Sequence, residues 1–486
     1  MVAPGRTGEP RMTTDAPRVR VLAVDLFESP YTMRMPFRFG VITVTEGLQA
    51  IVRVRLRHAD GREGFGYAAE ALAAKWFDKD PLLSDAQNVE QLRCALRLAR
   101  GAYLAAPPMS AFDLFAVHNR PLREAGAARG LQPLVSAYGP ALLDRAVLDA
   151  LCRIEDIGFW QAMQANLPGM HARTVARDLA DVDLSAFLGS LQPLQQLQVR
   201  HTVGLLDPIV AGDQPAGSRV DDGLPETLAE VAARYGNRYF KLKVSGRLDA
   251  DLDRLDRVAS VLDALPEPVY VTLDGNEQYD DADAVLALWQ AMQARPQLQR
   301  LCALTLLIEQ PIPRSKALAA PVTALAACRP VIIDESDGEI DSFLRARALG
   351  YTGVSSKACK GFYKSLLNLA RCRAWNAAEG GHWFMSAEDL TTQPGLSVQQ
   401  DMALVSLLGI SHVERNAHHF IDGFNGRPGN EADAFLQAHP DLYHREDGRV
   451  RLRIDGGCVV IASLAAAGFG SGVSPDLRTT RPMAAA

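Results

Sequence analysis

Three short apolar runs in the chain each end in a carboxylate. Asp274 follows the apolar part of VTLDGN, Glu309 that of LLIEQP, and Asp334 that of VIIDES. Buried carboxylates repel one another unless a cation lies among them, and an oxygen-rich site that leaves room for water or substrate suits Mg²⁺. Any one carboxylate could instead cap a helix or pair with a lysine. Three that recur in register favour a magnesium site.

Four lysines flank these carboxylates along the chain. Lys241 and Lys243 are two residues apart in FKLKV, and Lys357 and Lys360 are three apart in SSKACKG. Residues i and i+2 of a strand share one face, so Lys241 and Lys243 should point the same way. If they face the metal site, crowding should lower their pKa values and make a neutral base accessible. The alternative is a solvent-facing stripe on an edge strand.

The spacing of polar residues at predicted strand ends indicates how the chain positions them. Consecutive members of the series are 23 to 35 residues apart: Lys243, Asp274, Glu309, Asp334, Lys357, Ser386 and Glu414. One strand plus one helix takes about 30 residues, so these side chains should recur at one height of a closed barrel, at the rim where such barrels do chemistry. Lys357 would then face Lys243 across the barrel mouth. An open doubly wound sheet is the alternative, but no GxGxxG or Walker motif supports it.

The fold class follows from the hydrophobic patterns. From about residue 197, eight short apolar strands alternate with amphipathic helical segments, which predicts parallel strands: QVRHTVGL, YFKLKV, VYVTLDGN, LTLLIEQP, PVIIDES, GVSSKACK, HWFMSAED and SHVERN. Before them, residues 18–26 and 50–58 show strand alternation, and residues 83–127 and 139–165 show helical patterns. We therefore predict an α/β protein, a modified (β/α)8 barrel of the TIM-like (β/α)7β type with an α+β capping domain.

The predicted domains are a flexible tail (1–17), the capping domain (18–195), the barrel with its catalytic rim (196–425) and a C-terminal segment packing back on the cap (426–486). Within the 486 residues, 51 Lys plus Arg against 57 Asp plus Glu argue against binding of nucleic acid or anionic membranes. Seven cysteines without a CxxC pair fit neither a disulfide framework nor a thiolate zinc site, and no apolar run is long enough to span a membrane. We expect a cytoplasmic protein.

Taken together, the motifs resemble those of the enolase superfamily, and more narrowly its mandelate racemase/muconate-lactonising-enzyme subgroup. The matching motifs are KxK (Lys241, Lys243), DxN (Asp274, Asn276), EQP (Glu309), DES (Asp334, Glu335) and KxxK followed by Gly361. The RMPFRFG segment and the DGREGFG turn are similar to the family's capping domain. The resemblance covers most of the chain, although segments 105–135, 168–196 and 430–486 are longer than in most relatives.

The resemblance implies an enzyme that abstracts the proton α to a substrate carboxylate through an enediolate intermediate, with Mg²⁺, or Mn²⁺ in its place, neutralising the charge. Asp274, Glu309 and Asp334 would bind the metal, Lys243 and Lys357 would be the acid/base pair, and Lys241 would stabilise the intermediate. Further residues predicted at the site are Asn276, Glu335, Lys360, Ser386 and Glu414. Racemisation, epimerisation or cycloisomerisation is favoured over dehydration, and a homo-oligomer acting on a small carboxylate is expected.

The cap and the eighth strand should influence specificity. Arg34 is predicted to bind a distal anion, and Trp76 either to exclude water or to hold the cap on the barrel. Glu414-Arg415-Asn416 stands where dipeptide epimerases show DxD, which argues against dipeptides. His418 and His419 are predicted to be loop residues rather than ligands. Two other functions stay open: an aldolase-type lyase that uses a Schiff-base lysine, and a non-catalytic ligand-binding barrel.

Overall fold

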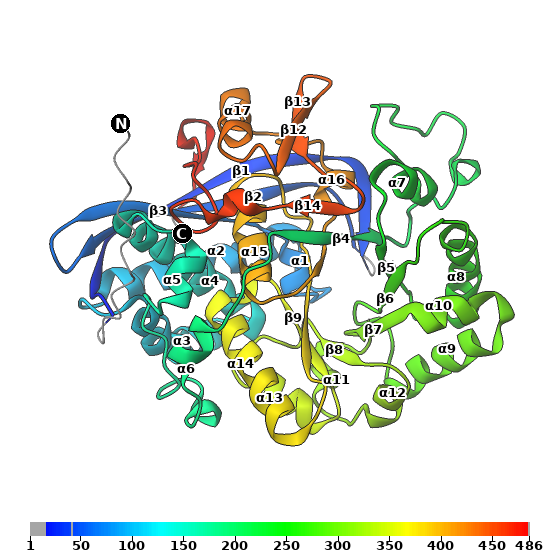
Figure 1. The fold of residues 1–486 in the computed structure, drawn as a ribbon, viewed down its shortest axis with the longest axis horizontal. Coiled ribbons are helices and arrows are strands. Elements are labelled where there is room, and N and C mark those ends of the chain that lie inside the picture. The colour runs from blue at the N-terminus through cyan, green and yellow to red at the C-terminus, as the bar shows by residue number, and fades with distance from the viewer. Residues whose placement is uncertain (1–15, 40–41, 485–486) are drawn as a thin grey trace, which may run out of the picture.

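The N-terminal half is built on an antiparallel sheet in the computed structural model, which describes residues 16–39 and 42–484. The sheet has the order β15-β1-β2-β3, and its strands are β1 (Val19–Phe39), β2 (Ile42–His58), β3 (Glu63–Ala71) and β15 (Arg481–Pro482). In β2, Val52, Val54 and Leu56 are buried in alternation with arginines, as the sequence predicts. β1 is much longer than the predicted strand, and β1 and β2 reach across the barrel (Figure 1).

The N-terminal half also contains helices. They are α1 (Ala74–Phe77), α2 (Asp85–Ala105), α3 (Ala111–Ala127), α4 (Pro133–Glu155), α5 (Phe159–Gln164) and α6 (Leu184–Gly189). Of these helices, α2 and α4 pack directly on this sheet. α4 packs directly on β3, because a Cβ added at Gly66 would lie 2.1 Å from the carbonyl oxygen of Ala146. The predicted helical segment 139–165 differs from the structure at both ends of α4. Pro133 starts that helix earlier, and Asp156, at φ 52°, ends it.

The second half forms a closed barrel of eight parallel strands, which confirms the predicted fold class. All eight strands predicted from the sequence are present: β4 (Gln196–Val203), β5 (Tyr239–Lys243), β6 (Tyr270–Asp274), β7 (Thr305–Glu309), β8 (Val331–Ile333), β9 (Gly353–Ser356), β10 (Phe384–Ala387) and β11 (His412–Glu414). They pair in chain order, and β11 pairs with β4 to close the ring. A ninth strand, β14 (Cys458–Val460), lies antiparallel to β4.

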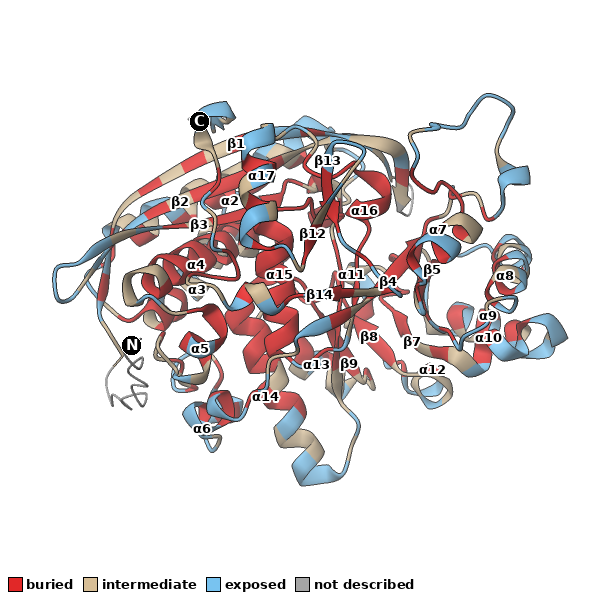
Figure 2. Ribbon diagram, turned by 45° about the horizontal axis from the view of Figure 1, so that its top comes forward, coloured by how far each residue is buried: buried red, intermediate tan, exposed pale blue. Residues whose placement is uncertain are grey.

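Helices surround the barrel and join it to the cap. They are α7 (Leu228–Tyr235), α8 (Leu248–Leu262), α9 (Ala282–Ala294), α10 (Gln299–Leu304), α11 (Arg314–Ala317), α12 (Thr323–Cys328), α13 (Ser342–Ala348), α14 (Phe362–Glu379), α15 (Leu396–Leu407) and α16 (Ala417–Phe420). Every residue of α15 is buried. Figure 2 shows α4 and α15 buried along almost their whole length, whereas α8, α9 and α10 expose their outer faces. The cap and the barrel therefore share one continuous core.

The C-terminal segment crosses both parts of the molecule. After α17 (Gly429–Ala438) come β12 (Tyr443–Glu446) and β13 (Arg449–Leu452), which form a hairpin. β14 then joins β4, and β15 pairs with β1 through Phe27 and Pro482. The predicted tail (1–17) lies almost entirely outside the described residues, and the other boundaries predicted from the sequence stay our proposed domain division. Within the described residues, no helix is both long enough and apolar enough to cross a membrane.

Candidate active site

The ends of neighbouring barrel strands bring the predicted polar residues together. Lys243 of β5 pairs in register with Asp274 of β6, and Asp274 pairs with Glu309 of β7. Asp334 directly follows β8, whose Ile332 pairs with Glu309. Three strand ends in succession therefore carry carboxylates at the same edge of the barrel. All three carboxylates are fully buried.

The ammonium group of Lys241 lies at the centre of four carboxylates. Its Nζ is 2.8 Å from Asp274 Oδ2 and Glu309 Oε2, and 2.9 Å from oxygens of Glu388 and Glu414. Burial alone would lower the pKa of Lys241, but the four carboxylates outweigh it and raise that pKa well above its ordinary value. Lys241 is therefore held as a cation.

A second group of charges surrounds Asp334. Lys357 Nζ donates to Asp334 Oδ2 at 2.6 Å, Lys360 Nζ lies 3.2 Å from Oδ1, and the Ser355 hydroxyl also donates to Oδ1. Although burial raises the pKa of Asp334, Lys357 and Lys360 lower it strongly. The indole ring of Trp76 covers Lys357, with Nζ 4.1 Å from the ring centroid. Trp76 thus connects the cap to this lysine.

Lys243 and Lys357 occupy opposite sides of the barrel. β5 and β9 are four strands apart in either direction around the closed ring. Lys243 is bound by Asp274 at 2.5 Å, and both lysines line the same cavity. The sequence predicts lowered pKa values for the crowded lysines, and for Lys241 that prediction is wrong. The pKa of Lys357 is raised as well, because Asp334 outweighs the effect of burial.

Asp274, Glu309 and Asp334 supply the right oxygen ligands for a magnesium ion, but these three carboxylates do not surround one common point. Within residues 16–39 and 42–484, no three His, Cys, Asp or Glu side chains are arranged to hold a metal ion. Lys241 lies between Asp274 and Glu309, while Asp334 turns to Lys357 and Lys360. The sequence predicts that these three carboxylates converge on a metal ion, but in the structure they form ion pairs with lysines.

The chemistry of the site nevertheless fits a hard divalent cation. Burial and the charges of Asp274 and Glu388 raise the pKa of Glu309 well above its ordinary value, and the contact with Lys241 offsets this only in part. Buried oxygens of Asn276 (Oδ1) and Glu335 (Oε2) have no hydrogen-bond partner among the described residues. Buried oxygens without donors are the kind of ligand that Mg²⁺ takes.

The other predicted residues hold this arrangement in place. Asn276 donates its backbone N–H to Asp274 Oδ1 at 2.8 Å, and Glu335 lies 3.4 Å from Lys79 Nζ. Ser386 donates to Glu388. Glu414 accepts hydrogen bonds from Thr202 at 2.6 Å and Asn416 at 2.9 Å.

Arg34 does not do what the sequence predicts. β1 continues through this residue, and its guanidinium binds both carboxylate oxygens of Asp222 at 2.6 Å and the carbonyl oxygen of His419 at 2.8 Å. Its other acceptors are backbone carbonyls, and it does not line the cavity. Arg34 fastens the cap strand to the barrel loops and is not available for a distal anion.

Sequence reasoning missed Glu388 and Arg200. Glu388 follows β10 two residues after Ser386, so both side chains share a face, and this period of two could have identified it. Arg200 of β4 is fully buried and pairs with Glu388 while also contacting Ser386 at 3.2 Å. An arginine in an apolar strand was the available signal, because a buried guanidinium needs an acidic partner.

A cavity of about 580 Å³ lies between the cap and this rim. Its floor contains Lys241, Lys243, Lys357, Asn276 and Glu414. Its walls come from β1, β2, α1 and the loop after β10. The cavity gives a small molecule access to both opposed lysines.

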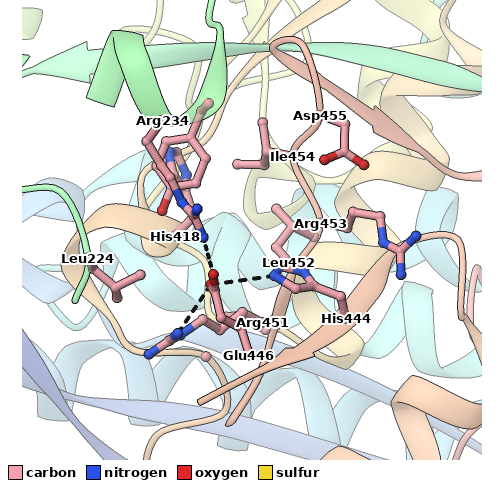
Figure 3. Close-up of a pocket in the computed structure, with 13 residues that line it drawn as sticks. Leu224, Arg234, His418, His444, Glu446, Arg451, Leu452, Arg453, Ile454 and Asp455 are labelled. Carbon is pink, nitrogen blue, oxygen red and sulfur yellow. Dashed lines mark hydrogen bonds and ion pairs between the residues drawn. The ribbon is translucent and has the colours of Figure 1, made fainter. Parts of the chain in front are cut away.

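A second cavity, of about 310 Å³, lies between α7, α16 and the β12–β13 hairpin (Figure 3). Its Glu446 is the common partner of Arg234, Arg451 and His444. His418 lines it, and both His418 and His419 are buried on α16, so their prediction as loop residues is wrong. Burial lowers the pKa of both imidazoles well below the ordinary value, which keeps them neutral.

Solved structures confirm the fold. A mandelate racemase/muconate lactonizing protein from Herpetosiphon aurantiacus matches 93% of this chain and 98% of its own, with a TM-score of 0.58 and 17% identity. A dipeptide epimerase from Enterococcus faecalis V583, complexed with Mg and the dipeptide L-Leu-L-Tyr, matches 93% and 99%, with a TM-score of 0.58 and 13% identity. A muconate lactonizing enzyme from Pseudomonas fluorescens, complexed with muconolactone, matches 95% and 98%, with a TM-score of 0.56 and 17% identity. No protein-family model and no curated protein matches the chain. The resemblance to these proteins, first suggested by the motifs, is confirmed in the fold.

Proposed function

We propose that the chain is a magnesium-dependent enzyme of the enolase superfamily that removes the proton α to a substrate carboxylate, and that it is an isomerase. The observation that carries the proposal is the placement of Lys243 and Lys357 on opposite strands of one ring, facing one cavity. A proton on a tetrahedral carbon between two amines can leave to one side and return from the other. That arrangement suits racemisation, epimerisation and cycloisomerisation better than elimination.

Each residue of the rim has a role in this mechanism. Lys243 and Lys357 are the acid/base pair, one for each face of the carbon. Lys241 places a fixed positive charge beneath the substrate carboxylate, where charge develops as the proton leaves. Asp274, Glu309 and Asp334 would hold Mg²⁺, with Asn276 and Glu335 near them. Bound Mg²⁺, or Mn²⁺ in its place, would supply further positive charge to stabilise the deprotonated substrate.

The proton acceptor must be a neutral amine. Lys357 donates to Asp334, and this contact favours the charged form of Lys357 by raising its pKa. If Asp334 turned to another partner, Lys357 would lose that stabilisation and release a proton more readily. Asp334 would therefore influence both the protonation of this base and the charge of the metal site.

Hydrogen exchange at carbon tests the proposal directly. The full-length protein is incubated in D₂O with N-acylamino acids, sugar acids, muconolactone and L-Leu-L-Tyr, and deuterium at the α-carbon is followed by NMR. We expect exchange with at least one compound, its loss with a chelator, and its recovery with Mg²⁺. Absence of exchange across the whole panel would contradict the proposal.

Two further measurements complete the test. Borohydride trapping of a covalent adduct between substrate and Lys243 or Lys357 would favour the Schiff-base lyase instead. Light scattering is expected to show a homo-oligomer.

A further inference from the structure

The walls of the rim cavity differ in chemistry from its floor. About 580 Å³ is within the range of pockets that hold drug-sized ligands, and a carboxylate with its α-carbon fills only part of it. The remaining space is bounded mainly by side chains of the cap and of the loop after β10, which are uncharged hydroxyls (Thr32, Thr43, Thr45 and Thr391) and apolar groups: Met33, Ile42, Val44, Leu48, Leu72 and Leu390. The distal part of a substrate would therefore lie largely against uncharged side chains.

The strand geometry of β2 directs these apolar side chains together. Ile42 and Val44 are half-buried, whereas Thr43 and Thr45, at the alternate positions, are exposed. Leu48, further along the strand, is also only half-buried. These apolar groups line the cavity with part of their surface uncovered, and an apolar ligand would remove that surface from water.

The charged groups along the walls already have partners. Outside the three rim lysines, the only cation among the described residues that line the cavity is Lys75. Its Nζ donates to the carbonyl oxygens of Leu83 at 2.6 Å and Asp80 at 3.4 Å. With Arg34 bound to Asp222, no cation of the described lining is free to receive a second anionic group.

The acidic groups of the cavity are likewise unsuited to bind a positive charge at the distal end of a substrate. Asp389 accepts backbone N–H groups from Thr392 at 2.9 Å and Asn416 at 3.0 Å, and it pairs with Arg415 at 3.2 Å. The Asp85 side chain is 90% exposed, and Glu46 is exposed as well. An ion pair with either exposed group would contribute little in water.

We infer that the substrate is a carboxylic acid whose distal part is an uncharged aliphatic or aromatic group. This inference rests on the proposed function in one respect only, that the carboxylate end binds at the lysines of the rim. The apolar walls select the other end, because a charged tail would lose its hydration there without gaining a partner.

Unreactive probes test the inference independently of catalysis. Binding of octanoate, suberate and 8-aminooctanoate to the full-length protein with MgCl₂ is measured by calorimetry. These three acids have chains of the same length and end in a methyl group, a carboxylate and an ammonium group. We expect octanoate to bind about tenfold more tightly than either charged probe, and each methylene removed from octanoate to weaken binding by about fourfold. Equal or tighter binding of a charged probe, or no binding of octanoate, would overturn the inference.

A charge placed in the wall should reverse the preference. Leu48→Lys is expected to tighten suberate and weaken octanoate by about tenfold each. The control is Leu82→Lys, at a leucine that is 87% exposed and does not line the cavity, and it should leave the preference unchanged. Selective binding of octanoate without any hydrogen exchange in D₂O would refute the proposed function and leave this inference standing. Hydrogen exchange confined to compounds with charged tails would refute this inference and leave the proposed function standing.

Discussion

Two clusters of buried charge in this protein differ in what sets the pKa values of their carboxyl groups. The rim cluster combines Lys241, Lys357 and Asp334 with further carboxylates, and it opens into the cavity. The seam cluster lies between α2, α4, β3 and α15, and it contains Glu70, Asp144, Arg145, Tyr103 and Gln400. In the rim, lysines lower the pKa of Asp334 despite burial. In the seam, burial raises the pKa of Asp144 to about 8 and that of Glu70 to about 7.

The difference shows that a perturbed pKa does not by itself identify a catalytic group. Asp144 accepts a hydrogen bond from the Tyr103 hydroxyl, and Glu70 pairs with Arg145 at 3.0 Å. None of these four residues lines the cavity, so no ligand there can reach them. Desolvation raises the pKa of the buried carboxyl groups in the seam, where a hydrogen bond and an ion pair compensate for it, whereas in the rim the lysines outweigh it at Asp334.

The largest expected effect comes from the opposed lysines. Lys243→Ala and Lys357→Ala should each abolish hydrogen exchange from one substrate enantiomer, by about 10²–10⁴-fold, because each removes the base on one face. Exchange of both enantiomers is followed by NMR in D₂O. Lys316→Ala, at an exposed lysine, serves as the control. Full exchange in both mutants would exclude the pair as bases.

Breaking the seam should affect stability and not metal binding. Arg145→Met leaves Glu70 buried without its cation, and we expect unfolding to become easier by about 3–5 kcal/mol. Denaturant unfolding of the mutant and the wild type measures this loss. Mg²⁺ affinity in the native mutant should match that of the wild type. A loss of Mg²⁺ affinity as large as that of a rim mutant would erase the distinction between the clusters.

Removing one charge from the rim should affect metal binding and not stability. Glu309→Gln keeps the shape of the side chain but lowers the negative charge of the metal site, so Mg²⁺ affinity should fall by about 100-fold. Calorimetry with MgCl₂ measures the affinity, and Glu379→Gln, on the surface end of α14, is the control. Unchanged affinity in Glu309→Gln would remove this residue from the metal site.

The seam should also make the free energy of unfolding depend on pH. The pKa of Asp144 rises from its ordinary 3.8 to about 8 on folding, so between these values the folded state holds a proton that the unfolded state has lost. Stability should therefore fall as pH rises from 4 to 8, by at most about 1.4 kcal/mol per pH unit for this group. Asp144→Asn, which keeps the acceptor for Tyr103, should flatten this slope in denaturant titrations. Asp280→Asn, at a side chain 93% exposed, should leave the slope as in the wild type.

Much of the fold could be predicted because its signals are local. Each barrel strand is a short apolar run, and seven of the eight are marked at their ends by a polar residue that recurs after one strand and one helix. The length of β1 and the start of α4 could not be predicted, because pairing with β2 extends the strand past its alternating region and α4 continues through Pro140, a residue more typical of a helix start. The sequence also could not show that Arg34 is bound away from the site, because its partner Asp222 lies far away in the sequence.

The sequence by itself determined the residue types of the rim and their order around the barrel, because a period of one strand and one helix places every such residue at the same edge. Only the tertiary structure decided which charges neutralise which. Lys241 meets Glu414 and Glu388, which come from strands two and three places away around the ring. The shape and polarity of the cavity were likewise decided by the cap strands that cover the rim. Electrostatic pairing and burial depend on distances through space, and those distances are fixed only when the barrel closes and the cap packs on it.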